Sequence, residues 1–269
     1  MDLRGASAEA VAALTTELDG VLRNATSASG VADDLFSVAM TLRSEGALRR
    51  FATDASVPTE ARQGLISEVF GGKVSSGALA LLRSAVARRW TSSRDLADAL
   101  EQLSVIALVK STGTESGRLS DELFAFGQAV QDNSDLRDAL SDPVRTAEDK
   151  GNLIERLLSG KALPATITLA RQSLSGSYRT VSAALADYQR TAAAVHGESV
   201  ATVRVARELT DSETRRLTAV LSAQYGRPVH LNLLVDPTVL GGIRVEIGDD
   251  VIDGTVSSRL DDARRKIAG

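Results

Sequence analysis

The sequence contains no cysteine, few aromatic residues and no long hydrophobic run. Without cysteine, the chain cannot form disulfides, carry out thiol catalysis or hold a metal through thiolates. Aromatic residues make up only 3% of the chain, which disfavours stacking on nucleic-acid bases. The longest apolar stretch, Val105–Val109, is far short of the ~20 residues that cross a bilayer. The N-terminal residues also lack the apolar core of a signal peptide, so we expect no direct membrane insertion.

Residue types that usually carry chemistry are also scarce or isolated. The two histidines, His196 and His230, have no partners at metal-ligand spacing. Glycine–lysine pairs occur at 72–73 and 160–161, but the other residues of a phosphate-binding loop are missing. The net charge of -4 lacks the basic excess of a nucleic-acid-binding protein. We therefore predict no catalytic residue, no cofactor, no metal site and no nucleic-acid partner.

Residues 1 to about 195 show apolar side chains at helical spacing throughout. Val11, Leu14, Leu18 and Leu22 share one helix face, and later segments repeat the pattern. None of these segments is apolar all round, which is typical of helices with one face on a core and one face in water. This part of the chain is predicted to be nearly all helix.

An internal repeat with a fixed offset of 88 residues runs through the helical region. The paired segments are DDLF at 33–36 with DELF at 121–124, EARQGLI at 60–66 with EDKGNLI at 148–154, and Trp90 with Tyr178. Chance similarity between amphipathic helices is the alternative explanation. Because the register needs no gap from 33 to 90, duplication is favoured. We predict two similar helical bundles.

From residue 196 the apolar period changes from helical to alternating. Strands are predicted around Val203, Leu231 and Val245, where apolar and polar side chains alternate. A helix between the first two strands is predicted from the capping box Thr210–Glu213. Asp249, Asp250 and Asp253 are interpreted as turn and cap residues rather than as acid–base or cation ligands, with Asp253 expected to cap a last helix. The fold class is thus mostly α with a small α/β tail.

Residues 231–264 read LNLLVDPTVLGGIRVEIGDDVIDGTVSSRLDDAR. This stretch closely resembles the delta subunit of bacterial F-type ATP synthases, whose mitochondrial relative is the oligomycin-sensitivity-conferring protein. The signature positions, which we interpret as structural, are Asp236, Gly241, Gly242, Gly248, Asp253, Gly254 and Arg259. The segment 140–158 resembles the family's N-terminal bundle, so the similarity extends over roughly 101–269. Common family members lack the bundle that precedes residue 101 here.

The resemblance implies a non-catalytic stator subunit in the peripheral stalk of the proton-translocating ATP synthase. Its expected partners are the alpha subunits of the catalytic head and the b subunit, at the cytoplasmic face of the cell membrane. The expected domains are an extra helical bundle at 1–100, the family-like bundle at 101–195 and the α/β domain at 196–269. A generic helical adaptor is the alternative, and an enzyme is a weaker third.

The resemblance also implies a docking groove for an alpha-subunit helix between the first and fifth helices of the second bundle. Here those helices would lie near 101–111 and 164–176. Candidate apolar lining residues are Val105, Leu108, Ile167 and Leu174. Burial inside the bundle is the competing expectation for each of them.

Overall fold

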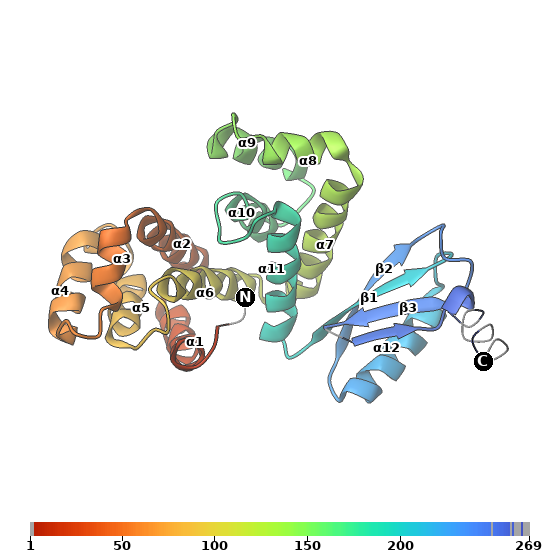
Figure 1. Cartoon of the computed structure of the whole chain (residues 1–269), viewed down its shortest axis with the longest axis horizontal. Coiled ribbons are helices and arrows are strands. Elements are labelled where there is room, and N and C mark those ends of the chain that lie inside the picture. The colour runs from red at the N-terminus through yellow and green to blue at the C-terminus, as the bar shows by residue number, and fades with distance from the viewer. Residues whose placement is uncertain (1–2, 249, 259, 261–264, 266–269) are drawn as a thin grey trace. The chain divides into compact units, whose positions relative to one another are not determined.

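The computed structural model describes residues 3–248, 250–258, 260 and 265 of the chain. It divides into two compact units, Met1–Ala192 and Ala193–Gly269. The first unit is all helical and the second combines a sheet with helix, as the labels in Figure 1 show. The predicted fold class, mostly α with a small α/β tail, is therefore confirmed. In the described residues, no helix has both the length and the apolar character that a bilayer crossing requires.

The helices of the first unit repeat in bounds as well as in sequence. The first series is α1 (Ala6–Asn24), α2 (Ala28–Ser44), α3 (Gly46–Thr53), α4 (Thr59–Phe70), α5 (Ser76–Ala87) and α6 (Asp95–Ser111). After a short 3-10 turn, η1 (Gly113–Glu115), come α7 (Ser116–Asp132), α8 (Ser134–Ser141), α9 (Ala147–Leu158), α10 (Pro164–Gln172) and α11 (Val181–Val195). Adding 88 to the bounds of α2, α3 and α4 gives those of α7, α8 and α9.

Hydrogen bonds at equivalent positions explain why the repeated motifs match. In the first repeat, the carboxylate of Asp34 on α2 accepts from the backbone N–H of Ser75 at 2.8 Å. In the second repeat, Glu122 on α7 accepts from the N–H of Leu163 at 2.8 Å. An acidic side chain thus caps the same helix start in both repeats, which gives the DDLF and DELF segments a common structural role.

The long helix α6 belongs to both repeats. The offset of 88 relates α1 to α6 and also relates α6 to α11, so α6 is the last helix of one series and the first of the next. Its buried side chains, among them Leu96, Leu103 and Ile106, lie on all sides of the helix. A helix that is apolar all round is one that is packed all round. The expected boundary between residues 100 and 101 falls inside this helix.

A buried carboxylate on α6 ties elements of the two repeats together. Glu101 is 1% exposed and forms an ion pair with Arg43 of α2. It also accepts hydrogen bonds from the Tyr188 hydroxyl of α11 at 3.0 Å and from the Ser177 N–H at 3.1 Å. Burial, followed by the adjacent negative charge of Glu101, raises the pKa of Tyr188, so this tyrosine stays a donor.

The second unit is a four-stranded sheet with the strand order β2-β1-β3-β4. The strands are β1 (Ser199–Val205), β2 (Val229–Val235), β3 (Ile243–Ile247) and β4 (Asp250–Asp253). Strands β1 and β2 are parallel, and the other two pairings are antiparallel. The helix α12 (Asp211–Tyr225) connects β1 to β2, and its Leu221 packs with Val203 and Val245 of the sheet.

Local signals in this unit act as the sequence predicts, with two corrections. The capping box of Thr210 and Glu213 is present, and Gly226 ends α12 in the left-handed conformation. Asp250 is not only a turn residue, because it begins the edge strand β4, which the sequence pattern did not predict. Asp253 is not the helix cap: the Thr255 hydroxyl accepts from the Ser258 N–H at 3.3 Å instead. Val256 is the first helical residue, so the cap position directly before it is Thr255.

Candidate partner-binding site

A groove runs between the α2 and α10 helices in the first unit. Its larger part is a hollow of about 840 Å³ lined by Phe36, Ile167 and Leu174, among others. An adjoining hollow of about 480 Å³ is lined by Leu108 and other residues. Asp33, Pro164 and Thr168 line both hollows, which makes them one continuous surface. We call this surface the α2–α10 groove.

The structure places three of the four predicted docking residues along the α2–α10 groove. Ile167 and Leu174 are half-buried and line the larger hollow. Leu108 is only 1% exposed and lines the smaller one. Val105, at 2% exposed, lines neither hollow and belongs to the packed interior of α6.

One wall of the groove was missed by sequence reasoning. Asp33, Phe36 and Ser37 come from α2, a helix of the first repeat, while the opposite wall comes from α9 and α10 of the second. The run Val105–Val109 was the available signal, since an apolar run on a helix that already has a buried face requires further helices around it.

The charged residues along the α2–α10 groove are mostly acidic. They are Asp33, Glu115, Glu148, Glu155 and Arg171. Arg171 forms an ion pair with Glu155. Apolar lining residues such as Phe36 and Ile167, together with these acidic ones, fit an amphipathic helix that carries lysine or arginine beside its apolar face.

The signature residues of the tail gather mainly at one loop contact in the second unit. The N–H of Val256 donates to the Gly241 carbonyl oxygen at 3.0 Å, and the N–H of Gly254 donates to that of Ile243 at 2.9 Å. At Gly242, where φ is 82°, an added Cβ would lie 2.3 Å from the carbonyl oxygen of Gly254. The loops at 241–242 and 254–256 therefore approach each other too closely for a side chain at Gly242.

The remaining signature positions have separate local roles. The carboxylate of Asp253 accepts from the N–H and hydroxyl of Thr255, at 3.0 and 2.7 Å. Asp236 makes the same pair of bonds with Thr238, at 2.9 and 2.6 Å. Gly248 turns the chain between β3 and β4 with φ 58°. Arg259 lies outside the described residues.

No group of three or more histidine, cysteine, aspartate or glutamate side chains is arranged to hold a metal ion within the described part of the chain. What the structure does present is a groove on a helical unit, followed along the chain by a small α/β unit. These features define a mostly helical protein with a surface groove.

Comparison with known proteins gives the particular family. The family model described as ATP synthase delta (OSCP) subunit matches residues 103–267. A protein of Nocardioides sp. (strain JS614) called ATP synthase subunit delta is 57% identical over 268 residues, covering 99% of this chain and 98% of that protein. Proteins of the same name are 42% identical in Nocardia farcinica, covering 97% of this chain and 96% of that protein, and 41% identical in Streptomyces coelicolor, covering 99% and 98%.

The chain belongs to the ATP synthase delta (OSCP) subunit family. It is a non-catalytic stator subunit of the F-type ATP synthase, in the peripheral stalk that links the catalytic head to the membrane sector. The coverage of these relatives extends over both helical repeats, so the first repeat is shared with them.

Proposed function

We propose that the second bundle, near 101–195, docks an N-terminal helix of an alpha subunit and that the C-terminal unit holds the b subunit. A subunit with both contacts, at the cytoplasmic face of the cell membrane, would prevent the catalytic head from turning with the rotor. The torque of the rotor then acts on the catalytic sites. The α2–α10 groove is the observation that supports the first contact.

Three features of the groove support a helix as its occupant. It extends along α10, from Pro164 to Leu174 and beyond the end of the helix. Half-buried Ile167 and Leu174 offer apolar contacts, while Leu108 in the adjoining hollow is already packed. An amphipathic helix would cover the half-buried side chains and place its basic residues against the acidic lining residues.

The test changes Ile167 to Asp. Because Ile167 is half-buried, a carboxylate there meets the incoming helix without first being sealed in the bundle core. Binding of a synthetic alpha N-terminal peptide should weaken by about 2 kcal/mol, which is roughly thirtyfold in Kd. Calorimetric titration measures this change. Leu108→Asp is a poorer test, because Leu108 is 1% exposed and the charge would endanger the fold.

The matched control is Leu157→Asp on α9. Leu157 is 38% exposed and lines neither hollow of the groove. It should leave peptide affinity unchanged, and circular dichroism should show full helix content for both variants. Unchanged affinity in a folded Ile167→Asp protein would show that the peptide does not use this groove.

A further inference from the structure

A small hollow lies where the end of α2, the helix α3 and the start of α6 come together. Its volume is about 390 Å³. The residues that line it are Arg43, Arg49, Arg94, Ala97, Asp98 and Ser177. Arginine thus accounts for half of the lining, and Asp98 is its acidic member. We call this surface the arginine hollow.

The charges at the arginine hollow do not cancel. Arg43 forms an ion pair with Asp98 at 2.8 Å and another with the buried Glu101. Arg49 and Arg94 have no carboxylate partner in the part of the chain that the structure describes. Three guanidinium groups therefore stand against two carboxylates, and the hollow keeps a positive excess.

The second repeat shows which of these charges the fold needs. The offset of 88 residues relates Arg49 to Arg137, and both donate from Nη1 to a carbonyl oxygen near the end of the preceding helix, at 2.8 Å. The same offset relates Arg43, Arg94 and Asp98 to the uncharged residues Gln131, Ser182 and Ala186. Arg49 thus has a role that both repeats share, whereas Arg94 has no such role.

Three side chains of the hollow have donors to spare. Arg94 is exposed, and its guanidinium makes no hydrogen bond or ion pair with any described residue. The Nε of Arg49 is buried and lacks a hydrogen-bond partner within the same residues. The N–H of Ser177 donates to Glu101, while its hydroxyl has no described partner. A buried donor without an acceptor is unfavourable, and an anion in the hollow would supply one.

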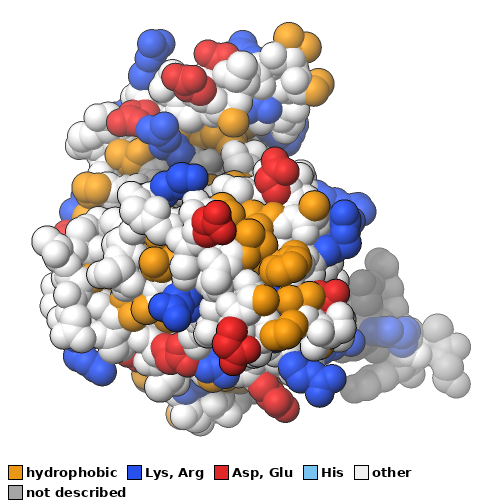
Figure 2. All heavy atoms as spheres, turned by 90° about the vertical axis from the view of Figure 1, so that its left-hand side faces the viewer, with side chains coloured by type: hydrophobic (Ala, Val, Ile, Leu, Met, Phe, Trp, Pro, Cys, Tyr) orange, Lys and Arg blue, Asp and Glu red, His pale blue; other side chains and the backbone are white. Residues whose placement is uncertain are grey.

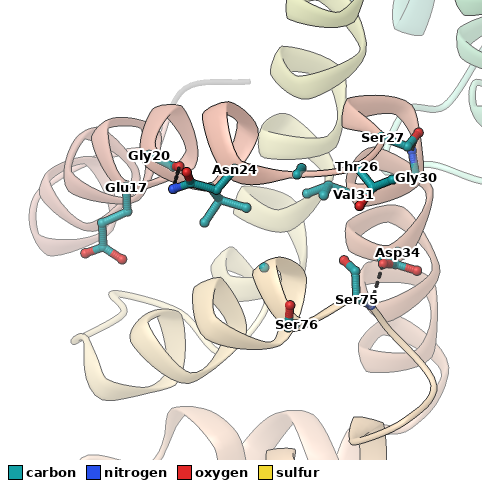
Figure 3. Close-up of a pocket in the computed structure, with 13 residues that line it drawn as sticks. Glu17, Gly20, Asn24, Thr26, Ser27, Gly30, Val31, Asp34, Ser75 and Ser76 are labelled. Atoms are coloured by element: carbon teal, nitrogen blue, oxygen red, sulfur yellow. Dashed lines mark hydrogen bonds between the residues drawn. The ribbon is translucent and has the colours of Figure 1, made fainter.

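The positive excess is local to this hollow. The chain as a whole has a net charge of -4. On the face shown in Figure 2, basic and acidic side chains are interspersed rather than gathered into separate fields. The hollow beside α1 and α5 in Figure 3 has the opposite sign, since its charged lining residues, Glu17 and Asp34, are acidic. Selective binding of an anion would therefore come from the arginine hollow itself and not from a general basic surface.

The arrangement of the donors favours a phosphate. They come from three segments: α3, the residue before α6, and the connection between α10 and α11. A phosphate presents oxygens in several directions, whereas the two oxygens of a carboxylate lie in one plane. Ala97 gives the lining little apolar surface for an organic group. The hollow also lies near the small end of ligand pockets, which span roughly 300–1,000 Å³.

We propose that the arginine hollow binds a small phosphate anion through Arg94, Arg49 and the Ser177 hydroxyl. This site does not depend on either partner contact of the proposed function. Arg49 and Arg94 belong to the first repeat and Ser177 to the second, so the bound anion would join the two repeats. A ligand that binds only the folded chain also raises its stability by mass action.

The test titrates the full chain with inorganic phosphate and follows binding by phosphorus NMR, while chloride keeps the ionic strength constant. We expect one phosphate per wild-type chain. Arg94→Gln should weaken binding about tenfold or more, because it removes charge-assisted donors. Ser177→Ala should weaken it by a smaller factor, since a neutral hydroxyl contributes less. Both residues are exposed, so circular dichroism should show an unchanged helix content.

Thermal unfolding gives a second measurement. Phosphate stabilises folded proteins in general, because it is excluded from their surfaces. The relevant quantity is therefore the difference between variants: phosphate should raise the unfolding temperature of the wild type more than that of Arg94→Gln.

Arg83→Gln on α5 is the matched control, since Arg83 is an exposed helical arginine that does not line the hollow. It should bind phosphate as the wild type does. No phosphate binding by the wild type, or equal binding by Arg94→Gln, would overturn the inference. Binding of a polyglutamate peptide that requires Arg94, without phosphate binding, would also overturn it and assign the hollow to an acidic protein segment. None of these results bears on the α2–α10 groove, which neither arginine lines.

Discussion

At the scale of single residues, Glu101 shows how the helical unit keeps a charge in its interior. Its two carboxylate oxygens receive bonds from a guanidinium, a phenol and a backbone N–H. Gly176 makes room for it, because a Cβ there would lie 2.2 Å from Oε1 of Glu101. A buried carboxylate with this many donors has its desolvation offset by its partners.

Removing the Glu101 carboxylate should therefore be costly. Glu101→Ala would leave the Tyr188 hydroxyl, on a side chain 1% exposed, without its acceptor and would leave Arg43 with Asp98 as its remaining carboxylate partner. We expect a loss of about 3–5 kcal/mol in the free energy of unfolding, the range for breaking a buried pair by deleting one partner. Urea denaturation followed by circular dichroism measures it.

Glu155→Ala is the comparison at the same residue scale. Glu155 also forms an ion pair with an arginine, but the two side chains are 51% and 45% exposed. Its removal should change stability by less than about 1 kcal/mol. Equal losses in the free energy of unfolding of the two variants would show that the contribution of Glu101 does not depend on its burial.

At the scale of elements, the contact between the loops at 241–242 and 254–256 leads to a prediction about stability. Gly242→Ala would place a methyl group against the carbonyl oxygen of Gly254 and would require φ of 82° from a residue with a side chain. We expect the C-terminal unit to lose at least about 1 kcal/mol of stability. Amide hydrogen exchange can measure this loss in strands β3 and β4.

A neighbouring turn provides the contrast. Gly248 also has a positive φ, 58°, but no atom lies within 4 Å of its Cβ position. Asparagine tolerates the left-handed region, so Gly248→Asn should be nearly neutral. If Gly248→Asn lowered stability more than Gly242→Ala did, the close approach of the two loops could not explain the effect of substituting Gly242.

Most helices and three of the four strands could be predicted from the sequence, because the signals that determine them are local. The spacing of Leu14 and Leu18 marks a buried helix face, and Thr210 with Glu213 marks a helix start. The offset of 88 residues predicted the duplication, and the helix bounds repeat with it.

Features that depend on distant segments were not predicted. Strand β4 has four exposed residues and shows no apolar alternation, so only its pairing with β3 makes it a strand. Burial of Leu108 was one of the two expectations for it, but no local pattern showed that α2 lies beside it along the same hollow. Ile167 and Leu174 were named as candidates because the family resemblance pointed to the segment 164–176, and their docking role stays a prediction.

At the scale of the whole molecule, we propose that the contact with the b subunit uses the surface around Leu240 and Val256. Leu240 is 77% exposed and Val256 is 43% exposed. They lie close together because the Val256 N–H donates to the carbonyl oxygen of Gly241. Leu240→Asp should weaken binding of a soluble b fragment to the full chain by about 2 kcal/mol, measured by titration.

Val220→Asp on α12 is the control for that measurement, since Val220 is 54% exposed and lies on a different element. Affinity for the alpha peptide should not change in either variant. If Val220→Asp weakened b binding and Leu240→Asp did not, the b contact would belong to the helix α12 rather than to the loop at 240.

The double membership of α6 has an evolutionary consequence. One in-frame duplication of an 88-residue segment adds only the five α-helices of one period, because each series closes on the helix that opens the next. No additional linker is needed, because the shared helix joins the new copy to the old one. The same event repeated would lengthen the chain as a solenoid grows, one period at a time.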